Sequence, residues 1–410
     1  MALEKINTSI CIIGAGPAGT STSIFLSKLG IKHIIVDSAN FPRKKVCGDG
    51  LDLKSLRMLN HIDPKIIPNE LLNTPDFTPS WGFRIISPKG VNSDFILNPE
   101  KGYEKRVPFI VSKRIIFDNF LIKKLDSSTA DFRQGTKITS ISKEGETWTL
   151  KASTADSELT ITCKLIVGAD GDHSTVLKHL GDRKVNRRHY IGSVRQYWKN
   201  VSGMSNHNLL EIYYPKNLPM SYFWIFPLSN GEANVGYAIT NEIAKNFNLN
   251  IRETFKEIIE KDPAISHRFK DATPIAELEG MGIPVASLQR KVVGNGWILV
   301  GDAASMASPT SGEGIGTGMM TGYIAAKFIE KGIKANDFSE VVIGNYSREI
   351  FKRMKLEIRN YNLSLKYPFI ANLVANYLIG NNFISRFIVN YKFRGLLKTC
   401  YEKEVEVELE

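Results

Sequence analysis

The sequence predicts a mixed α/β fold, in which a doubly wound α/β domain is interrupted by an antiparallel-sheet domain and followed by C-terminal helices. A strand, a glycine-rich turn, a helix and a second strand follow one another within residues 9–36. Long β-type runs dominate residues 190–239, and a buried strand with a second glycine-rich turn returns at residues 297–316. A chain that leaves and re-enters its first domain in this way carries the sheet domain as an insertion.

The individual elements follow from the apolar patterns. In the first domain, helices are expected at residues 20–29 and 113–124, and strands at 9–13, 31–36, 136–141, 147–151, 159–166 and 297–300. In the inserted domain, we expect strands at 209–214, 222–227 and 233–239, before a helix at 251–260. Amphipathic helices are expected from residue 337 onward.

These elements divide the chain into three parts. The first domain is discontinuous and takes residues 1–75, 105–180 and 285–330. The inserted sheet domain takes residues 76–104 and 181–284, and a C-terminal helical region takes residues 331–410. We expect the sheet domain to form the roof of an active site.

The composition predicts a folded protein with an anionic or phosphorylated partner. The chain has 410 residues, of which 43% are hydrophobic, enough to bury a large core. The formal net charge of +11 favours an acidic membrane surface, a phosphorylated cofactor or a phosphorylated substrate. Because the basic residues lie in small scattered clusters, we expect no nucleic-acid partner. Solvated surface is the alternative role for these clusters.

Cysteine spacing and hydropathy predict a cytoplasmic protein with no metal site. The cysteines lack the close spacing of a zinc site and stand at Cys11, Cys47, Cys163 and Cys400. The N-terminal lead is too short for a signal peptide. The most lipid-like stretch, residues 367–389, is interrupted by asparagines and an arginine, and is too polar to span a membrane. Peripheral contact with a membrane stays open, and we expect a monomer or small homo-oligomer.

The first glycine turn predicts a dinucleotide site of the Rossmann type. In the hexamer 14–19, Gly14 allows the tight turn, Gly16 lets a pyrophosphate approach, and Gly19 lets helix and strand pack, with Ala18 at the same helix start. The helix N-terminus then binds the anion. Asp37 ends the next strand, where a carboxylate accepts hydrogen bonds from ribose hydroxyls. The motif does not choose between NAD and FAD, and a glycine turn without a ligand is the alternative.

The second glycine turn favours FAD over NAD. Residues 301–326, GDAASMASPTSGEGIGTGMMTGYIAA, resemble the second FAD motif of the p-hydroxybenzoate-hydroxylase-like flavoproteins. This resemblance implies a Rossmann-like FAD-binding domain, with Asp302 on the ribityl chain and further cofactor contacts at Pro309, Gly312, Gly314 and Ile315. Independently, a helix that opens at the glycines can place its N–H groups against the flavin N1–C2=O edge. A glycine-rich helix start without ligand is the alternative.

Two weaker motifs belong to the same resemblance. Residues 168–174 resemble the middle GADG motif of this superfamily, near the FAD pyrophosphate. Arg114 resembles the superfamily arginine that reaches the FAD, although Arg114 and Asp118 can also be a charge pair on a surface helix. His173 is interpreted as a solvent-facing turn residue.

A loop after the second strand narrows the family. Residues 41–51, FPRKKVCGDGL, resemble the FPRxKxCGxGL segment of the geranylgeranyl reductase family. The resemblance implies that Cys47 and Gly48 border the isoalloxazine ring. The charges of Lys44 and Lys45 can lower the pKa of the Cys47 thiol if they lie close, whereas a plain buried cysteine is the alternative.

The inserted domain carries the second family segment. Residues 219–227, PMSYFWIFP, match the PxxYxWxFP substrate signature of that reductase family. On a strand, alternation places Tyr222, Trp224 and Phe226 on one face, where three rings make a wall suited to an isoprenoid chain. An aromatic face packed into an ordinary core is the alternative.

The same resemblance implies roles for other residues of the inserted domain. Arg195 and Tyr197 resemble the family's R-x-Y segment and are expected to line the substrate pocket. Where the family usually has Gly-x-Gly after the signature, this chain has Gly236-Tyr237-Ala238. The extra methyl group leaves the shape of that end of the cavity open, and with it the chain length of the substrate.

The resemblance implies an FAD-dependent oxidoreductase of the geranylgeranyl reductase type. Reduced FAD transfers a hydride from N5 to a C=C bond of an isoprenoid or similar hydrophobic substrate, such as a prenyl diphosphate or a lipid, in lipid biosynthesis. NADPH or another external reductant supplies the electrons. Cys47, Tyr222 and water are the candidate proton donors.

Two other functions stay open. A flavin monooxygenase or halogenase shares both FAD motifs and acts on an aromatic or polyene substrate, but only Trp224 and Pro227 align with the halogenase segment Trp-x-Trp-x-Ile-Pro. Oxygen dependence separates this class from a reductase. The third possibility is a flavin-binding protein without catalysis, whose flavin no donor reduces.

Overall fold

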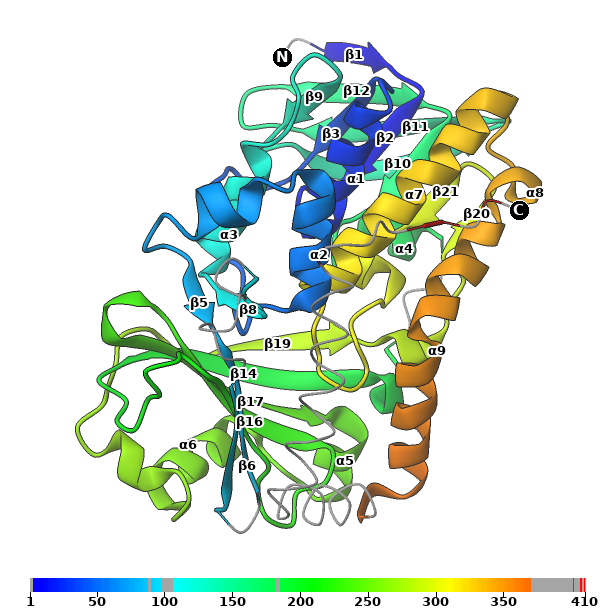
Figure 1. Cartoon of the computed structure of the whole chain (residues 1–410). Coiled ribbons are helices and arrows are strands. Elements are labelled where there is room, and N and C mark those ends of the chain that lie inside the picture. The colour runs from blue at the N-terminus through cyan, green and yellow to red at the C-terminus, as the bar shows by residue number, and fades with distance from the viewer. Residues whose placement is uncertain are drawn as a thin grey trace.

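The computed structural model describes residues 3–87, 90–96, 106–180, 185–369, 401, 406–407 and 409. Figure 1 shows two sheet regions, one above the other, and a long C-terminal helix that runs beside both. The predicted mixed α/β fold is confirmed. The segment at residues 370–389, which is most of the lipid-like stretch, and Cys400 lie outside the described residues.

The upper region is built on a six-stranded sheet. All neighbouring strands pair in parallel except β20 and β21. Three central strands, ICII, HIIV and LIVG, are apolar throughout or nearly so and buried along their whole length, as expected for parallel strands covered on both faces. In order across the sheet the strands are β20 (Val293–Gly294), β21 (Trp297–Leu299), β13 (Leu165–Gly168), β2 (Ile10–Ile13), β3 (His33–Val36) and β9 (Ala130–Arg133).

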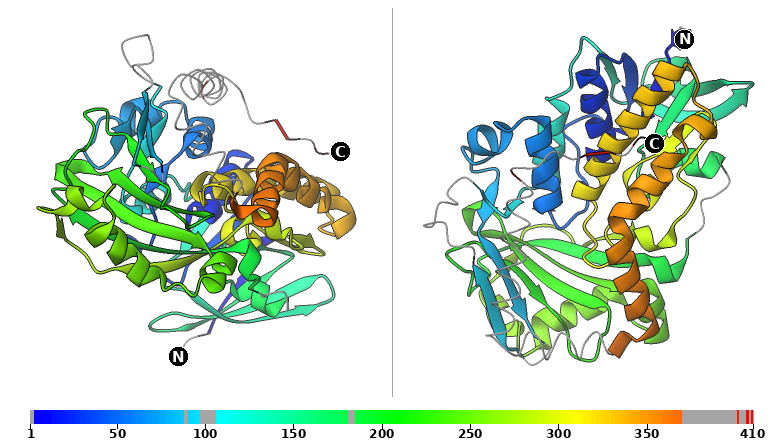
Figure 2. Two further views of the ribbon diagram at one scale, coloured as in Figure 1. Left: turned by 90° about the horizontal axis from the view of Figure 1, so that it is seen from below. Right: turned by 45° about the vertical axis from the view of Figure 1, so that its right-hand side comes forward.

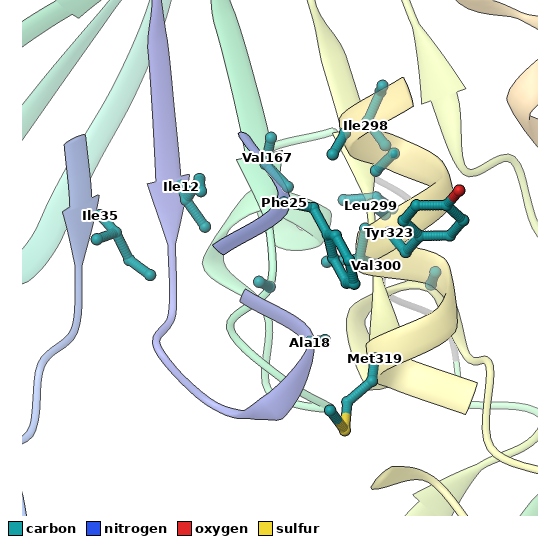
Figure 3. Close-up of a cluster of buried hydrophobic side chains, with 14 of the residues drawn as sticks. Ile12, Ala18, Phe25, Ile35, Val167, Ile298, Leu299, Val300, Met319 and Tyr323 are labelled. Carbon is teal, nitrogen blue, oxygen red and sulfur yellow. The ribbon is translucent and has the colours of Figure 1, made fainter. Parts of the chain in front are cut away.

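Two helices cover one face of this sheet and pack on each other: α1 (Pro17–Lys28) and α7 (Ile315–Ala335). Figure 3 shows their shared core, in which Phe25 of α1 meets Tyr323 of α7 with ring centroids 4.7 Å apart. A Cβ atom added at Gly322 would lie 2.5 Å from the carbonyl oxygen of Ala18. Small residues at this crossing therefore let the two helices approach closely, which brings their N-termini to the same edge of the sheet.

A four-stranded sheet covers the other face: β1 (Leu3–Asn7), β12 (Glu158–Cys163), β11 (Thr147–Ser153) and β10 (Lys137–Glu144). The prediction of one strand at residues 159–166 is wrong, because the chain passes from this sheet to the six-stranded sheet at Lys164. Burial alternates along β12 but is continuous along β13. The predicted helix at residues 20–29 begins earlier, at Pro17, since a proline is well tolerated in the first helical turn.

The lower region is an eight-stranded sheet. Its strands are β18 (Thr273–Pro274), β14 (Tyr190–Lys199), β17 (Glu232–Thr240), β16 (Ser221–Pro227), β15 (Leu210–Tyr213), β6 (Gly82–Ile86) and β7 (Asn92–Ile96), with β19 (Glu279–Pro284) also paired to β14. The pairing is antiparallel except between β15 and β6, which come from separate chain segments. Helices α5 (Asn241–Asn246) and α6 (Ile251–Lys261) cover its outer face.

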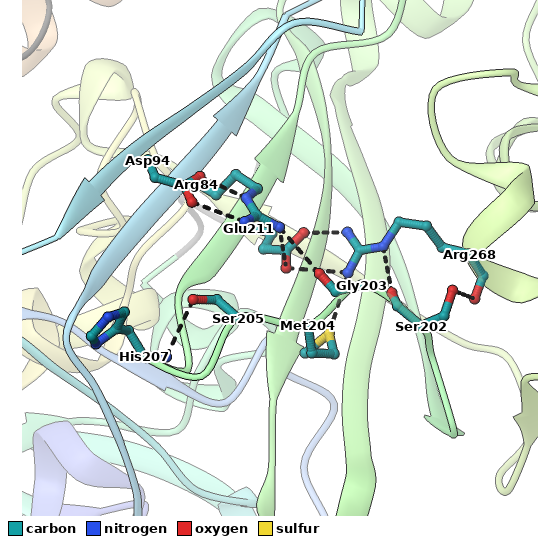
Figure 4. A network of polar contacts seen from close by, with 9 residues as sticks. All are labelled: Arg84, Asp94, Ser202, Gly203, Met204, Ser205, His207, Glu211 and Arg268. Carbon is teal, nitrogen blue, oxygen red and sulfur yellow. Dashed lines mark hydrogen bonds and ion pairs between the residues drawn. The ribbon is translucent and has the colours of Figure 1, made fainter.

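An ion network also fixes the outer face of this sheet. The buried Glu211 carboxylate on β15 pairs with Arg268 and lies 3.4 Å from Nη1 of Arg84. Arg84 in turn donates from Nε to Oδ1 of Asp94 over 2.6 Å, as Figure 4 shows. Two arginines thus balance two carboxylates, so that no buried charge of this group is left uncompensated.

Smaller elements join the two regions. A three-stranded sheet lies between them, formed by β4 (Gly50–Leu51), β8 (Phe109–Val111) and β5 (Thr78–Ser80). The helices α2 (Leu53–Ile62) and α3 (Arg114–Ile122) follow β4 and β8. The short helix α4 (Thr175–His179) follows the end of β13.

The C-terminal helices connect both regions. After α7 and α8 (Glu340–Ile343), the long helix α9 (Asn345–Lys366) runs down the side of the molecule, as the right-hand view of Figure 2 shows. Tyr346 donates to the carbonyl oxygen of Leu299 over 2.7 Å, and Tyr361 donates to that of Arg188 over 2.8 Å. The predicted boundary at residue 331 falls inside α7, which ends at Ala335. Within the described residues, no helix combines the length and apolar character needed to cross a membrane.

Candidate functional site

A cavity of about 920 Å³ lies where the carboxyl ends of the parallel strands face the eight-stranded sheet. Most of the predicted site residues line it: Gly14, Gly16, Ala18, Asp37, Cys47, Gly48, Arg114, Arg195, Tyr222, Trp224, Phe226, Asp302, Gly312, Gly314 and Ile315. Gly19, Pro309 and Tyr197 are not part of the lining. Residues from both ends of the chain and from the inserted sheet thus meet around one space.

The first glycine loop follows β2 and opens α1. Gly14 has a φ of 102°, and a Cβ there would lie 2.4 Å from the carbonyl oxygen of Ala169, so only glycine fits. At Gly19 a Cβ would lie 1.9 Å from the Gly14 oxygen, which explains why this residue packs helix against loop rather than lining the cavity. A Cβ at Gly16 would meet only Arg43 Nη2, at 3.3 Å. The side of Gly16 that faces the cavity is therefore open to a ligand.

Asp37 stands at the end of β3, next to this loop. Its Oδ2 accepts the Ala15 amide over 2.7 Å, and its Oδ1 accepts the Ala39 amide over 2.8 Å. The two backbone bonds orient the carboxylate, and each oxygen keeps a lone pair for a further donor. This is the position at which a carboxylate can hold ribose hydroxyls.

The second glycine loop lies against the first. It contains a single 3₁₀ turn, residues 301–304, before α7 begins at Ile315. A Cβ at Gly301 would lie 2.8 Å from Cβ of Ala18, so the two loops touch. Burial raises the pKa of Asp302, while the positive charge of Lys45 opposes this rise. Lys45 Nζ donates to the Met281 sulfur over 3.5 Å, and burial lowers its pKa.

Arg114 and Asp118 form a buried pair, not a surface one. Arg114 Nε lies 2.6 Å from Asp118 Oδ1, and both residues are almost inaccessible to solvent. Arg43 Nη2 also reaches Asp118, at 3.2 Å. The alternative that the two residues form a charge pair on a surface helix is therefore wrong. Asp118 fixes the Arg114 guanidinium, which places a positive charge at the cavity.

The thiol of Cys47 is not activated by neighbouring lysines. Burial raises the pKa of this thiol, and the cation that acts most strongly against the rise is Arg114. The expectation that Lys44 and Lys45 lower this pKa is wrong, because desolvation outweighs the nearby charges. Cys47 therefore keeps its proton at neutral pH.

Three rings of β16 form a wall of the cavity. Tyr222, Trp224 and Phe226 line it, with ring centroids 5.8 Å apart for the first pair and 6.3 Å for the second. Phe223 and Ile225 point the other way, into the core beneath α6. A Cβ at Gly236, opposite Trp224 on β17, would lie 2.1 Å from Trp224 Cζ2. The missing side chain at residue 236 thus makes room for the indole ring.

A buried hydrogen-bond network joins this wall to the loop around Cys47. Trp224 Nε1 donates to Asn234 Oδ1 over 2.9 Å. Asn234 Nδ2 donates to the Cys47 carbonyl and to Asp49 Oδ2, both over 2.8 Å. Asn234 and Asp49 are fully buried. One side chain therefore holds the aromatic wall and the loop in register.

Asp49 is the acidic end of this network. Tyr197 donates its hydroxyl proton to Asp49 Oδ2 over 2.6 Å, which places Tyr197 behind the cavity lining. Burial raises the pKa of Asp49 to about 6, against the hydrogen bonds from Tyr197 and Asn234. Arg195 stacks over the Tyr197 ring, 4.1 Å from its centroid, and its Nη1 lies 2.9 Å from Glu279.

Tyr222 has its hydroxyl engaged elsewhere. It donates to the Ser311 carbonyl over 2.7 Å and lies beside Gly312 in the turn before α7. Burial raises its pKa well above the usual range. The ring thus ties the aromatic wall to the second glycine loop, and its proton is not readily released.

The sequence patterns assigned no role to several polar residues of the cavity region. Asp49 stands within the 41–51 segment, so that segment was the available signal. Glu313 stands between two glycines of the second motif in the same way. Asn234 carried no signal, because its role depends on partners far away in sequence.

Comparison with known proteins decides the family. The family described as FAD binding domain matches residues 7–337, most of the chain. The chain belongs to this family. FAD is therefore its cofactor, and the predicted FAD-binding domain is confirmed.

Two similar proteins carry names of the geranylgeranyl reductase type. Digeranylgeranylglycerophospholipid reductase of Methanocaldococcus jannaschii is 29% identical over 373 residues, which cover 90% of this chain and 87% of that protein. A geranylgeranyl bacteriochlorophyll reductase-like protein of Thermoplasma acidophilum has the same fold, with a TM-score of 0.75, 21% identity, and coverage of 98% and 93%. The resemblance to the geranylgeranyl reductase family is confirmed.

The fold is also shared with another reaction class. The flavin-dependent brominase Bmp2 superposes with a TM-score of 0.77 at 20% identity, covering 97% of this chain and 94% of that one. At this identity the likeness shows the fold alone. The reaction must therefore be argued from the cavity.

The residues of the cavity fit FAD. The open side of Gly16 and the oriented Asp37 carboxylate suit the pyrophosphate and the ribose. Asp170 accepts the Thr175 amide with Oδ2, while its buried Oδ1 has no hydrogen-bond partner among the described residues. An orphaned acceptor in the lining is readily explained by a ligand that donates to it. FAD supplies two-electron hydride chemistry when bound there.

Proposed function

We propose that this chain is an FAD-dependent reductase that saturates a C=C bond of an isoprenoid or similarly apolar substrate. The observation that carries the proposal is the contact between the aromatic wall and the loop of Cys47 and Gly48. A Cβ at Gly48 would lie 3.6 Å from Trp224 Nε1, and one at Gly50 would lie 3.4 Å from Phe226. An apolar chain on this wall is therefore held against the loop that borders the flavin.

The proposed roles follow the position of each residue. The cofactor-binding residues are Gly14, Gly16, Ala18, Gly19, Asp37, Cys47, Gly48, Arg114, Asp302, Pro309, Gly312, Gly314 and Ile315. The substrate-binding residues are Arg195, Tyr197, Tyr222, Trp224 and Phe226. Gly19, Pro309 and Tyr197 act through the residues they support, since they do not line the cavity. NADPH or another external donor reduces the flavin.

The name of the digeranylgeranylglycerophospholipid reductase supports an isoprenoid lipid as substrate, and a prenyl diphosphate offers the same kind of apolar chain. The buried Arg195 guanidinium adds a positive charge in the same cavity, and its Nε has no hydrogen-bond partner among the described residues. Such a group suits the phosphate of a lipid or a diphosphate. We place the protein in the cytoplasm, at most in peripheral contact with a membrane, as a monomer or small homo-oligomer.

The decisive experiment is an anaerobic incubation. The purified FAD-loaded protein is reduced with dithionite and incubated with geranylgeranyl diphosphate or a geranylgeranylated glycerophospholipid, and the product is weighed by mass spectrometry. We expect a gain of two hydrogen atoms for each saturated bond without O₂. Turnover that requires O₂, with oxygen or halide incorporated into an aromatic or polyene substrate, would instead favour the monooxygenase or halogenase alternative suggested by the brominase fold.

Removal of the central ring should separate substrate binding from cofactor binding. In Trp224→Ala, the loss of roughly 2–3 kcal/mol of apolar contact lowers kcat/KM about 30-fold to 150-fold. The FAD content, measured from flavin absorbance per protein, stays near the wild-type value. Phe223→Leu is the matched control, since Phe223 points into the opposite core and its truncation lowers stability without lowering turnover. Loss of FAD from Trp224→Ala would place that ring in the support of the fold.

A further inference from the structure

Glu313 occupies an unusual position in the turn before α7. Its Oε1 accepts a hydrogen bond from the Gly316 amide, which caps the start of the helix. Its Oε2 is inaccessible to solvent and has no hydrogen-bond partner among the described residues. Glu313 also lines the cavity, and Tyr222 of the aromatic wall lies beside the preceding Gly312. One carboxyl oxygen is thus buried and unpaired close to the place where flavin and substrate must meet.

A second carboxyl group lies next to it. Asp52 caps α2, where its Oδ1 accepts the amides of Lys54 and Ser55, each over 3.0 Å, and it also lines the cavity. The starts of α2 and α7 touch, since a Cβ at Gly316 would lie 2.4 Å from the Ser55 amide nitrogen. The two capping carboxyls therefore belong to helix starts that touch, and each acts on the other by its charge.

The other charged groups around Glu313 come from four segments of the chain. Lys54 of α2 carries the nearest positive charge, and its Nζ lies 2.5 Å from Glu357 Oε1 of α9. Beyond Gly314 stands Asp302, whose Oδ1 would be 3.3 Å from a Cβ at that glycine, with Lys45 beyond it.

The balance of these groups keeps a proton on the pair. Burial, and after it the negative charge of Asp52, raise the pKa of Glu313 to about 8 against the opposing charge of Lys54. Burial raises the pKa of Asp52 as well. Two carboxyls in such proximity do not both ionise at neutral pH, because the second charge is repelled by the first.

We propose that Glu313 and Asp52 together hold one proton at neutral pH, which Glu313 carries, and that Glu313 is the acid that supplies the proton consumed when the C=C bond is saturated. This inference rests on the proposed function. One alkene carbon takes a hydride, with two electrons, from the reduced flavin. The neighbouring carbon takes the proton of Glu313, so that the carboxyl O–H bond breaks, a C–H bond forms, and the carboxylate is left behind.

Glu313 suits this role better than the two residues that the sequence indicated. The hydroxyl of Tyr222 is bound to a backbone carbonyl, and burial makes it a weaker acid than usual. Burial also weakens the thiol of Cys47 as an acid. An acid is most effective in proton transfer when its pKa lies near the working pH, which holds for Glu313.

The surroundings provide a way to restore the proton. Lys54 and Glu357 form a pair whose side chains keep 35% and 25% of their accessible surface, so solvent reaches them. Ser308 donates to the other oxygen of Glu357 and links this pair to the loop before α7. This partly exposed edge is the route by which we expect a proton from solvent to return to the carboxyl pair.

The first test needs no substrate. Infrared difference spectra of the FAD-loaded protein between pH 6 and pH 10 report the carbonyl stretch of a protonated carboxyl group. We expect a component of this band with a midpoint near pH 8 in the wild type, distinct from the Asp49 component near pH 6, and the loss of the component near pH 8 in Glu313→Gln. In Asp52→Asn the midpoint moves to lower pH, because the neighbouring charge is gone. Glu340→Gln, a half-exposed carboxylate on α8, is the matched control and keeps the band.

The second test measures the proton transfer itself. In anaerobic single turnovers of the prereduced protein, Glu313→Gln should slow alkene saturation by about 100-fold to 10,000-fold at unchanged FAD content. Glu313→Asp should recover part of the rate. If Glu313→Gln keeps both the band and the rate, the inference is overturned while the proposed function stands. If the wild-type band titrates as expected but no alkene is saturated, the proposed function and the donor role fail and the shared proton stands.

Discussion

Replacement of Gly14 by alanine should weaken FAD binding at least about 100-fold, equivalent to roughly 2.7 kcal/mol. The φ of 102° at this residue is strained for any side chain, and the new Cβ would overlap the carbonyl oxygen of Ala169 at 2.4 Å. The backbone must therefore move, which takes the Ala15 amide away from Asp37. Titration of the apoprotein with FAD, followed by flavin fluorescence, gives the dissociation constant.

Gly30→Ala is the matched control for this prediction. Gly30 also has a positive φ, of 69°, but nothing lies within 4 Å of an added Cβ, and it follows the far end of α1. This variant should lose about 1 kcal/mol of stability and keep the wild-type FAD affinity. If Gly14→Ala folds, as judged by circular dichroism, and binds FAD like the control, the assignment of this loop to the cofactor is wrong.

Replacement of Asn234 by leucine should destabilise the FAD-loaded protein by about 3–9 kcal/mol, because three buried polar groups each lose a partner at roughly 1–3 kcal/mol. These groups are the Trp224 indole, the Cys47 carbonyl and the Asp49 carboxyl. The indole also loses its fixed orientation, so kcat/KM should fall with stability. Urea unfolding at saturating FAD and steady-state kinetics measure the two effects.

Tyr197→Phe tests whether Asn234, which makes three hydrogen bonds in this network, matters more than Tyr197, which makes one. It removes only the hydrogen bond to Asp49, which Asn234 continues to donate to, and should cost about 1–2 kcal/mol. Equal losses of unfolding free energy in the two variants, or a loss below about 1 kcal/mol in Asn234→Leu, would contradict the central position of Asn234 in the network.

The cofactor loops could be predicted from sequence because their requirements are local. Gly14 and Gly301 both have a positive φ, a local backbone conformation that favours glycine, whereas the atoms that an added Cβ would meet belong to Ala169 and Ala18, far away in sequence. The alternation of β16 is equally local, so the division between Trp224, which faces the cavity, and Phe223, which faces the core, was predictable from spacing.

The buried polar groups of the site could not be predicted from local sequence patterns. Asn234 meets Cys47 across 187 residues of sequence, and no short pattern encodes a contact of that range. The pKa of Cys47 depends on burial, which only the folded chain sets, and charge counting along the loop gave the wrong direction. Lys164 is the single residue between β12 and β13. One polar residue between two apolar segments does not indicate that the chain passes from one sheet to another.

The order of strands in the six-stranded sheet has a consequence for synthesis. β2 begins at residue 10, its neighbour β13 ends at residue 168, and the next strand, β21, ends at residue 299. On the ribosome, the first phosphate-binding loop is therefore made long before the partners that enclose it, and nascent chains must wait for α7 before they can capture flavin. FAD therefore binds and stabilises the completed polypeptide. Riboflavin starvation should lower the yield of mature protein after translation and leave its rate of synthesis unchanged.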